Sequence, residues 1–239
     1  NNSFGINYIY IHLFSGTILF ATVNYDSNNN TIGQNFTQEQ DFSKSNFRTI
    51  SEQNNLTTNV VFERKIKFIK SRIKTEFTFA NSKGINYLSN IENSFVSKIY
   101  SSKISLISNF KKKLINYTVG FENQSVIINY EKFNLKNKSE KKLLFINFDG
   151  TINKNLKYHI GNSYHLFQAS NINVYFNKTD FEFTYDNENR NWKYFLKGND
   201  IFNIKSNQII ENNLESNLEQ TRIRSRIPGF IGLGIKYIL

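Results

Sequence analysis

Apolar and polar residues alternate along most of this chain with a period of two. Between residues 72 and 79, one set of alternate positions is apolar or small and the other is polar or charged: Ile73, Thr75, Phe77 and Phe79 against Arg72, Lys74, Glu76 and Thr78. Successive side chains of a β-strand point to opposite faces of the sheet, whereas a helix repeats every 3.6 residues. We therefore predict β-strands with one apolar face and one hydrated face.

The same alternation predicts about eleven strands, and no stretch of the chain shows the period of a helix. The predicted strands are 3–12, 16–26, 55–66, 70–82, 94–109, 113–132, 141–152, 156–167, 172–186, 191–203 and 228–239. In the strand at 172–186 the apolar phase slips near Lys178, which we interpret as a β-bulge. The last strand is apolar on one face, so it needs pairing on both edges and an apolar environment for that face.

Short and long connections alternate between these strands. The short turns lie at 13–15, 67–69, 110–112, 153–155 and 187–190, and the long polar connections at 27–54, 83–93, 134–140 and 204–227. All short turns therefore fall on one side of the sheet, as in outer-membrane barrels with short periplasmic turns and long outside loops. We predict that residues 1–239 form one domain segment of an antiparallel up-and-down transmembrane β-barrel, with its long loops outside and its C-terminus periplasmic.

The odd number of predicted strands bears on whether these residues form a complete barrel. Bacterial single-chain barrels have an even number of strands, so we expect about 11–12 strands here as part of a larger barrel. The chain contains no Met and begins with no apolar signal segment, from which we expect a fragment or a processed product. A small complete outer-membrane barrel remains an alternative.

Composition agrees with a sheet that is wet on one side. Hydrophobic residues make up only 39% of the chain and its mean hydropathy is -0.48, although it has 23 Phe and 13 Tyr. The net charge of +11 is spread along alternating strands instead of forming one basic tract, so we predict a hydrated lumen face and no nucleic-acid partner. Such charges could also contact lipid phosphates or attract anionic solutes. The absence of cysteine excludes disulfides and thiolate metal sites.

The C-terminal fifty residues contain the motif Asp200-Ile201-Phe202-Asn203, followed by a polar loop and a strand opening with Pro228. This segment resembles the end of TonB-dependent outer-membrane receptors of the Bacteroidota type, which have a similar Asp-Leu-Phe-Asn. Gly234, Tyr237 and Leu239 are similar to the terminal signal read by the barrel-assembly machinery, although that signal usually ends in an aromatic residue. The rest of the chain matches only as a pattern.

This resemblance implies the second half of a 22-stranded barrel in the outer membrane, which takes up a large or scarce solute. The plug domain, the motif that contacts TonB and the first strands are absent from this sequence. TonB contact would therefore run through another part of the protein, and a surface lipoprotein would be a further partner. The resemblance implies no cofactor.

Several residues are candidates for membrane or ligand contacts. Aromatic residues near strand ends are expected at the membrane interface: Tyr185, Trp192, Tyr194, Phe230 and Tyr237. Arg222, Arg224 and Arg226 could bind anions, although we favour a solvated loop face as their explanation. The three histidines show no metal-ligand spacing.

A catalytic serine and histidine pair is not expected. Ser163 and His159 would lie about 13 Å apart along a strand, and Ser163 and His165 about 7 Å apart. Both separations exceed hydrogen-bond reach, so we expect no enzymatic activity and no catalytic, cofactor or metal residues. The main alternative to the barrel is a soluble, basic, extracellular β-sandwich or adhesin-like binding module, in which a second sheet would cover the apolar face.

Overall fold

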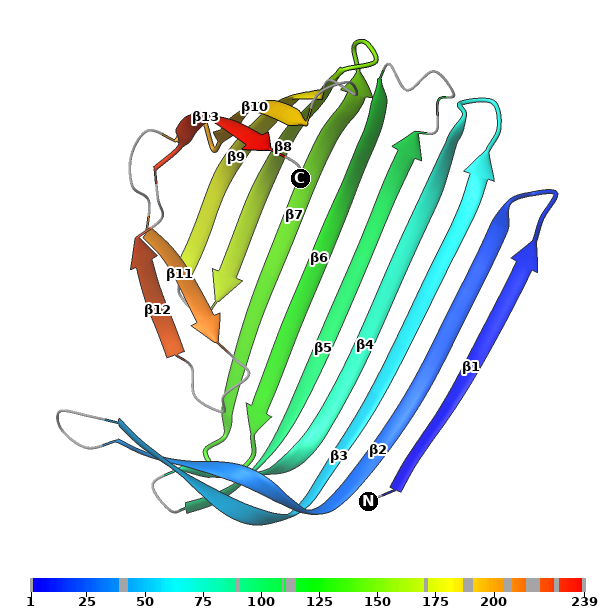
Figure 1. The fold of residues 1–239 in the computed structure, drawn as a ribbon. Coiled ribbons are helices and arrows are strands. Elements are labelled where there is room, and N and C mark those ends of the chain that lie inside the picture. Colours follow the sequence, from blue (N-terminus) through cyan, green and yellow to red (C-terminus); the bar gives the residue numbers. More distant parts are fainter. Residues whose placement is uncertain are drawn as a thin grey trace.

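The computed structural model consists of β-strands joined by turns, and it contains no helix in the part of the chain that it describes (Figure 1). It describes residues 2–38, 43–88, 91–108, 110, 115–169, 172–186, 191–203, 208–213, 220–225 and 228–237. The strands are β1 (Asn2–His12), β2 (Thr17–Gln38), β3 (Ser43–Ile66), β4 (Ser71–Leu88), β5 (Ile91–Ser108), β6 (Asn116–Tyr130), β7 (Leu135–Thr151), β8 (Leu156–Ala169), β9 (Ile172–Asp186), β10 (Trp192–Asn199), β11 (Gln208–Asn213), β12 (Gln220–Ser225) and β13 (Phe230–Tyr237).

Eleven of these strands form one sheet in which chain neighbours are also sheet neighbours. The order runs from β1 to β10 and then to β13, while β11 and β12 form a separate two-stranded sheet. Consecutive strands of the main sheet pair antiparallel, and β2 also makes a short parallel contact with β4. The sheet curves across its width into an open trough, with β1 at one edge and β13 at the other (Figure 1). The prediction of an all-β, antiparallel, up-and-down fold with about eleven strands is confirmed.

The short turns have the local geometry of tight hairpins. Hydrogen bonds of 3.2 Å close two of them, from Gly16 N to Leu13 O and from Lys70 N to Lys67 O. The closing residue of each turn has a left-handed backbone, with φ of 60° at Gly16 and 49° at Lys70. This geometry suits hairpin loops because it follows the twist of the flanking strands. The predicted turns at 111–112 and 187–190 lie outside the described residues.

At the end of the sheet that carries the short turns, each strand extends about one residue further than its neighbour, measured against the row of cross-strand partners. The row of cross-strand partners that starts at Thr17, the first residue of β2, reaches Thr179 in β9. Thr179 lies seven residues before Asp186, where β9 ends. Seven residues of about 3.3 Å over seven strand spacings of about 4.8 Å correspond to a strand tilt of roughly 35°. Strands of closed barrels tilt by about 35–45°.

The prediction that the long polar connections are loops is wrong for most of their described length, because they are strand. Strands β2 and β3 stay paired from Thr17 and Arg64 to Gln38 and Ser43, so residues 27–38 and 43–54 are strand and not loop. Residues 83–88 and 91–93 likewise extend β4 and β5. Residues 135–140 belong to β7, and the segment 204–227 contains the β11–β12 hairpin. Backbone pairing stabilises these extensions although they have few apolar residues.

The predicted β-bulge near Lys178 is also absent. Strands β8 and β9 pair without interruption from Leu156 with Tyr185 to Ala169 with Ile172. The phase slip arises because Phe176 lies on the polar face, where its ring stacks on that of His165 at 4.4 Å between centroids. The aromatic partner satisfies this side chain without a change in backbone register.

The described residues form hardly any buried apolar interior. Only Ile128, Tyr130 and Ala169 are buried hydrophobic residues, and no large side chain among those described is fully buried. Most large apolar side chains are instead partly or largely exposed. The sheet therefore has two exposed faces, and their chemistry decides what the molecule can do.

Candidate functional site

One face of the sheet is apolar across all eleven strands, and we call it the outer face. Cross-strand partners lie on the same face, so the registers connect Tyr8 of β1 through every intermediate strand to Ile235 of β13. Many of its large apolar side chains are 37% to 84% exposed, and others such as Leu19 and Phe62 are partly exposed. The exposed ones are Phe4, Ile6, Tyr8, Tyr10, Val23, Tyr25, Phe77, Tyr100, Ile104, Phe121, Leu144, Ile146, Phe148, Ile160, Tyr164, Tyr175, Tyr185, Trp192, Tyr194, Ile231, Leu233, Ile235 and Tyr237.

The apolar part of the outer face is a band on the turn side of the sheet. In β4 it extends from Ile73 to Phe79, and beyond it the same face carries Asn81 and Lys83. In β7 it extends from Phe148 to Leu144, beyond which the face carries Lys142. The strand extensions that sequence analysis interpreted as loops lie beyond this boundary. The apolar band is therefore followed on the same face by a polar region.

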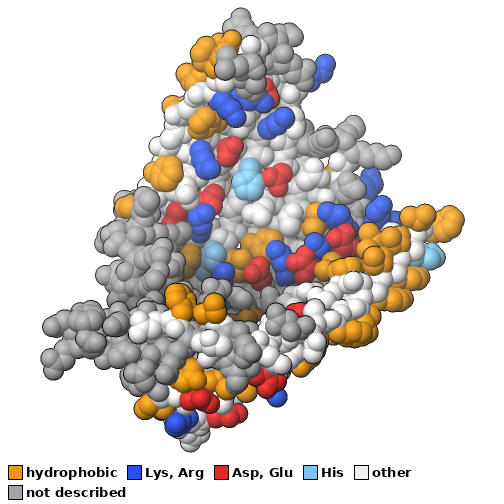
Figure 2. All heavy atoms as spheres, turned by 60° about the horizontal axis from the view of Figure 1, so that its bottom comes forward, with side chains coloured by type: hydrophobic (Ala, Val, Ile, Leu, Met, Phe, Trp, Pro, Cys, Tyr) orange, Lys and Arg blue, Asp and Glu red, His pale blue; other side chains and the backbone are white. Residues whose placement is uncertain are grey.

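The opposite, inner face carries most of the charged side chains of the strands. Figure 2 shows Lys, Arg, Asp, Glu and His side chains gathered in the hollow of the trough. Alternating charges face one another across neighbouring strands, as in Glu76, Lys103 and Glu122 of β4, β5 and β6. The hollow is therefore a polar surface that water can hydrate.

Ion pairs neutralise much of the charge on this inner face. Those with distances are Arg72–Glu63 (3.4 Å), Lys74–Glu63 (3.7 Å), Lys103–Glu122 (3.7 Å), Lys178–Asp180 (2.6 Å), Lys193–Asp186 (2.5 Å) and Lys197–Glu182 (3.7 Å), and Lys74 also pairs closely with Glu76. All of these side chains are partly exposed, so each pair contributes at most about 1 kcal/mol to stability. Their main effect is a lining that presents both signs of charge.

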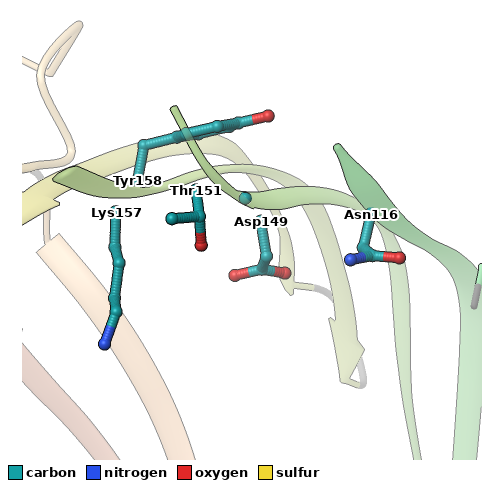
Figure 3. A pocket seen from close by; sticks show the side chains of 6 residues that line it. Asn116, Asp149, Thr151, Lys157 and Tyr158 are labelled. Atoms are coloured by element: carbon teal, nitrogen blue, oxygen red, sulfur yellow. The ribbon is translucent and has the colours of Figure 1, made fainter. Parts of the chain in front are cut away.

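A shallow hollow of about 340 Å³ lies at the turn end of the inner face. Its lining includes Asn116, Asp149, Thr151 and Lys157, whose side chains point to one side of the ribbon in Figure 3, while Tyr158 lies on the other side. Next to it, His159 Nδ1 donates a hydrogen bond of 2.6 Å to Asp149 Oδ1. The hollow is open and polar, which suits contact with a hydrated solute more than enclosure of a small apolar ligand.

Ser163 and His165 correct an expectation from the sequence. Their side chains share a hydrogen bond of 3.0 Å between Oγ and Nε2, although two residues along a strand separate their backbones by about 7 Å. Side chains on one face lean toward each other, and the backbone distance overstated the separation. The stacking of His165 on Phe176 holds the imidazole beside the serine.

Four of the five predicted interface aromatics lie together at the turn end of the outer face. Trp192 is the cross-strand partner of Tyr237, with ring centroids 4.7 Å apart, and Tyr194 is the partner of Tyr185 at 6.3 Å. Phe230 does not join them: it lies on the inner face, at the other end of β13. The phase that places Ile231 outward places residue 230 inward, so the interface prediction for Phe230 stays a prediction.

The segment Asp200, Ile201, Phe202 and Asn203 forms a tight turn after β10, and Gly229 N, just before β13, donates to Asn203 O at 2.7 Å. Asn203 N donates to Asp200 O at 2.8 Å, and Asp200 N donates to Asp180 Oδ1 at 2.8 Å. Asp200 adopts φ of 51°, a left-handed conformation that Asp tolerates better than most residues. Gly229 lies so close that an added Cβ would sit 2.0 Å from Asp200 O. The motif therefore has a structural role at the start of β13.

The remaining candidates are described only in part. Gly234 faces inward against the ring of Phe195, while Leu239 lies outside the described residues. Arg222 and Arg224 belong to β12, with Glu211 and Ile209 of β11 as their cross-strand partners. Arg226 lies outside the described residues, so the anion-contact prediction stays a prediction.

Comparison with protein-family models and with curated proteins gives no relative for this chain. No protein-family model matches it, and no curated protein matches it either. Among the described residues, no group of three His, Cys, Asp or Glu side chains is placed to hold a metal ion. The described part of the chain also has no helix with the length and hydropathy needed to cross a membrane.

Proposed function

We propose that this chain forms part of the wall of a transmembrane β-barrel in a bacterial outer membrane. The observation that carries the proposal is the outer face, whose apolar side chains stay exposed over eleven consecutive strands while the charges gather on the inner face. A contiguous apolar surface of this extent marks contact with lipid or with another protein. In the proposal the outer face contacts lipid and the inner face lines a hydrated lumen.

The apolar band and the aromatic residues at its edge bear on lipid contact. From Ile73 to Phe79, β4 rises roughly 20 Å along its own axis. At a tilt of roughly 35° this corresponds to about 16 Å along the membrane normal, shorter than the apolar band of about 25 Å in outer-membrane barrels. Four aromatic side chains lie together at one edge of this band: Trp192, Tyr194, Tyr185 and Tyr237. In a membrane protein, amphipathic aromatic side chains are found at this level, the membrane interface.

A soluble β-sandwich accounts less well for the same surface. In a sandwich, a second sheet packs about 10 Å from the first and buries the apolar face. In the described part of this chain nothing covers the outer face, and Leu233 and Ile235 remain 84% and 63% exposed. The stagger of about one residue per strand also matches the tilt of a barrel wall.

For the finer function we propose solute uptake by a TonB-dependent receptor, with this chain as the C-terminal part of its barrel. The support is the resemblance around Asp200–Asn203 together with the inner face, which presents both signs of charge to the lumen. Contact with TonB, a surface lipoprotein and the barrel-assembly machinery belongs to this proposal. The lumen would accept a polar solute too large to diffuse through a porin.

The single tryptophan provides a direct test of lipid contact. The chain would be refolded into vesicles whose lipids carry bromine at defined acyl depths, and quenching of Trp192 fluorescence would be measured. The proposal predicts strongest quenching by bromine placed shallowly, near the headgroup, because Trp192 lies at the edge of the band. Acrylamide in the water phase should quench Trp192 less in vesicles than in urea.

Two outcomes would contradict the proposal. The first is a chain that stays soluble and folded without detergent or lipid, which would point to the sandwich. The second is a membrane-bound chain in which the quenching of Trp192 does not depend on the depth of the bromine. Non-specific adsorption to the vesicle surface would give this result, because it would not hold Trp192 at a fixed depth.

A further inference from the structure

The polar region of the outer face carries a group of lysines that we call the outer lysine belt: Lys83 of β4, Lys98 of β5, and Lys136, Lys138 and Lys142 of β7. The registers place all five on the same face as the apolar band. Beyond the band, Glu92 of β5 and Glu140 of β7 are the described acidic residues of β4–β7 on that face. The belt therefore has an excess of positive charge.

The position of the belt relates it to the apolar band. Lys142 follows Leu144, the last apolar residue of the band in β7, at the next position on that face. Lys98 follows Tyr100 in the same way in β5, and the Tyr100 ring lies 5.1 Å from that of Phe79. If the band spans the hydrocarbon, the lysines lie at the level of the headgroups.

Part of the charge of the belt has no ion pair. Glu140 pairs with Lys138 at 2.5 Å and with Lys142 at 3.5 Å, whereas Lys98 has no carboxylate within ion-pair distance in the described part of the chain. The same holds for Lys83 and Lys136 within the ranges that the structure covers. On the inner face Lys74 and Lys103 pair with Glu76 and Glu122. Three of the five belt lysines are therefore open to an external anion.

Strand β6 forms a low floor between the lysines. Lys98 and Lys138 are both cross-strand partners of Ile127, so their backbones lie about 10 Å apart on either side of β6. The neighbouring side chains of β6 on that face, Ser125 and Asn129, are short and polar. Two long ammonium side chains on either side of a shallow floor can converge on one phosphate group.

We propose that the outer lysine belt binds the phosphate groups of anionic lipid headgroups in the leaflet on the side of the strand extensions. Charge complementarity and continuity with the apolar band carry the inference, which rests on the proposed membrane function. A lysine near an anionic membrane surface contributes enough attraction for about a fivefold change in binding. Binding should weaken with salt, because these side chains are exposed.

The test uses a reporter beside the belt. In a Trp192→Phe, Tyr100→Trp protein refolded into vesicles, quenching would be compared between brominated phosphatidylglycerol and brominated phosphatidylcholine at equal mole fraction. We expect a preference for phosphatidylglycerol that falls at least fivefold in the triple variant Lys98→Gln, Lys136→Gln, Lys138→Gln. The inner-face variant Lys103→Gln is the matched control and should keep the parent's preference.

The outcomes separate this inference from the proposed function. Equal quenching by both lipids in the parent protein, or a preference that the triple variant retains, would overturn the lysine belt while leaving membrane insertion intact. An absence of quenching by either lipid would instead contradict insertion itself. A loss of preference in Lys103→Gln equal to that in the triple variant would show a general charge effect and would also overturn the belt.

Discussion

Single residues on the inner face show how closely the strands approach. Gly234 of β13 faces Phe195 of β10, and an added Cβ would lie 2.0 Å from the ring atom Cζ. Gly120 and Phe145 repeat this pairing between β6 and β7. A ring that covers a cross-strand glycine shields the exposed backbone hydrogen bonds beneath it, a device known to stabilise sheets.

Gly234→Ala should therefore destabilise the sheet. Because the methyl group forces the Phe195 ring out of its site, we expect a loss of about 1–3 kcal/mol in the free energy of unfolding. The matched control is Gly232→Ala, two residues earlier on the same face, where no heavy atom lies within 4 Å of the added Cβ. Urea unfolding in detergent micelles measures both. Equal effects of the two substitutions would contradict the role of Phe195.

Glu140 gives a second prediction at this scale. The hydrogen bond from Lys138, with the further attraction of Lys142, holds the pKa of the Glu140 carboxyl below its ordinary value. Because the folded pKa is depressed, the contribution of Glu140 to stability is present above its ordinary pKa and is lost as pH falls through the folded value. In Lys138→Gln, a carboxyl NMR titration should show the Glu140 pKa rising toward 4.5. An unchanged pKa would mean that Lys138 is not its main partner.

Among the elements, the β2–β3 hairpin shows most clearly that the strands continue beyond the apolar band. It has 22 residues in β2 and 24 in β3, well above the roughly 9–11 residues that cross a bilayer. Tyr25 and Leu56 are partners at the end of its apolar part, and the remainder pairs through the backbone. The distal half should therefore be separable from membrane insertion.

We predict that the distal hairpin can be removed without loss of folding. Deleting residues 31–50 and replacing Ser51 by Gly leaves an Asn-Gly turn at Asn30 and keeps the pair Asn29 and Glu52 in register. Heat-resistant migration on a semi-native gel should persist, because no band residue changes. Deleting Thr22 alone is the control: it shifts the register by one and turns the band residues Val23 and Tyr25 to the inner face, so heat-resistant migration should decrease.

The sequence predicted the strands of the band well and the strand extensions poorly. Alternation identified Ile73, Phe77 and Phe79 as one face because lipid or protein must cover apolar side chains and water must reach the others. Beyond the band both faces are wet, so the Asn- and Ser-rich residues of β2 and β3 carry no such signal. Cross-strand packing also decided the Ser163 and His165 contact, which backbone spacing alone could not indicate.

For the whole molecule, the sheet leaves its two edge strands without a second neighbour among the described residues. β1 is exposed along its full length, with Phe4 and Ile9 both 62% exposed. β13 pairs with β10 on one side. A closed barrel would pair both edges with further strands and would remove the aggregation hazard of open apolar edges. The tilt derived from the register is compatible with such closure.

The most direct test of the account asks whether neighbouring residues of one strand meet different solvents. The chain has no cysteine, so single substitutions can each carry one nitroxide label: Phe77→Cys and Phe121→Cys on the outer face, and Thr78→Cys and Glu122→Cys on the inner face. In vesicles, collision rates with lipid-soluble oxygen and with a water-soluble nickel complex would be measured. The account predicts oxygen access at residues 77 and 121 and nickel access at residues 78 and 122. Equal nickel access at all four positions, or protection of residues 77 and 121 from both reagents, would contradict it.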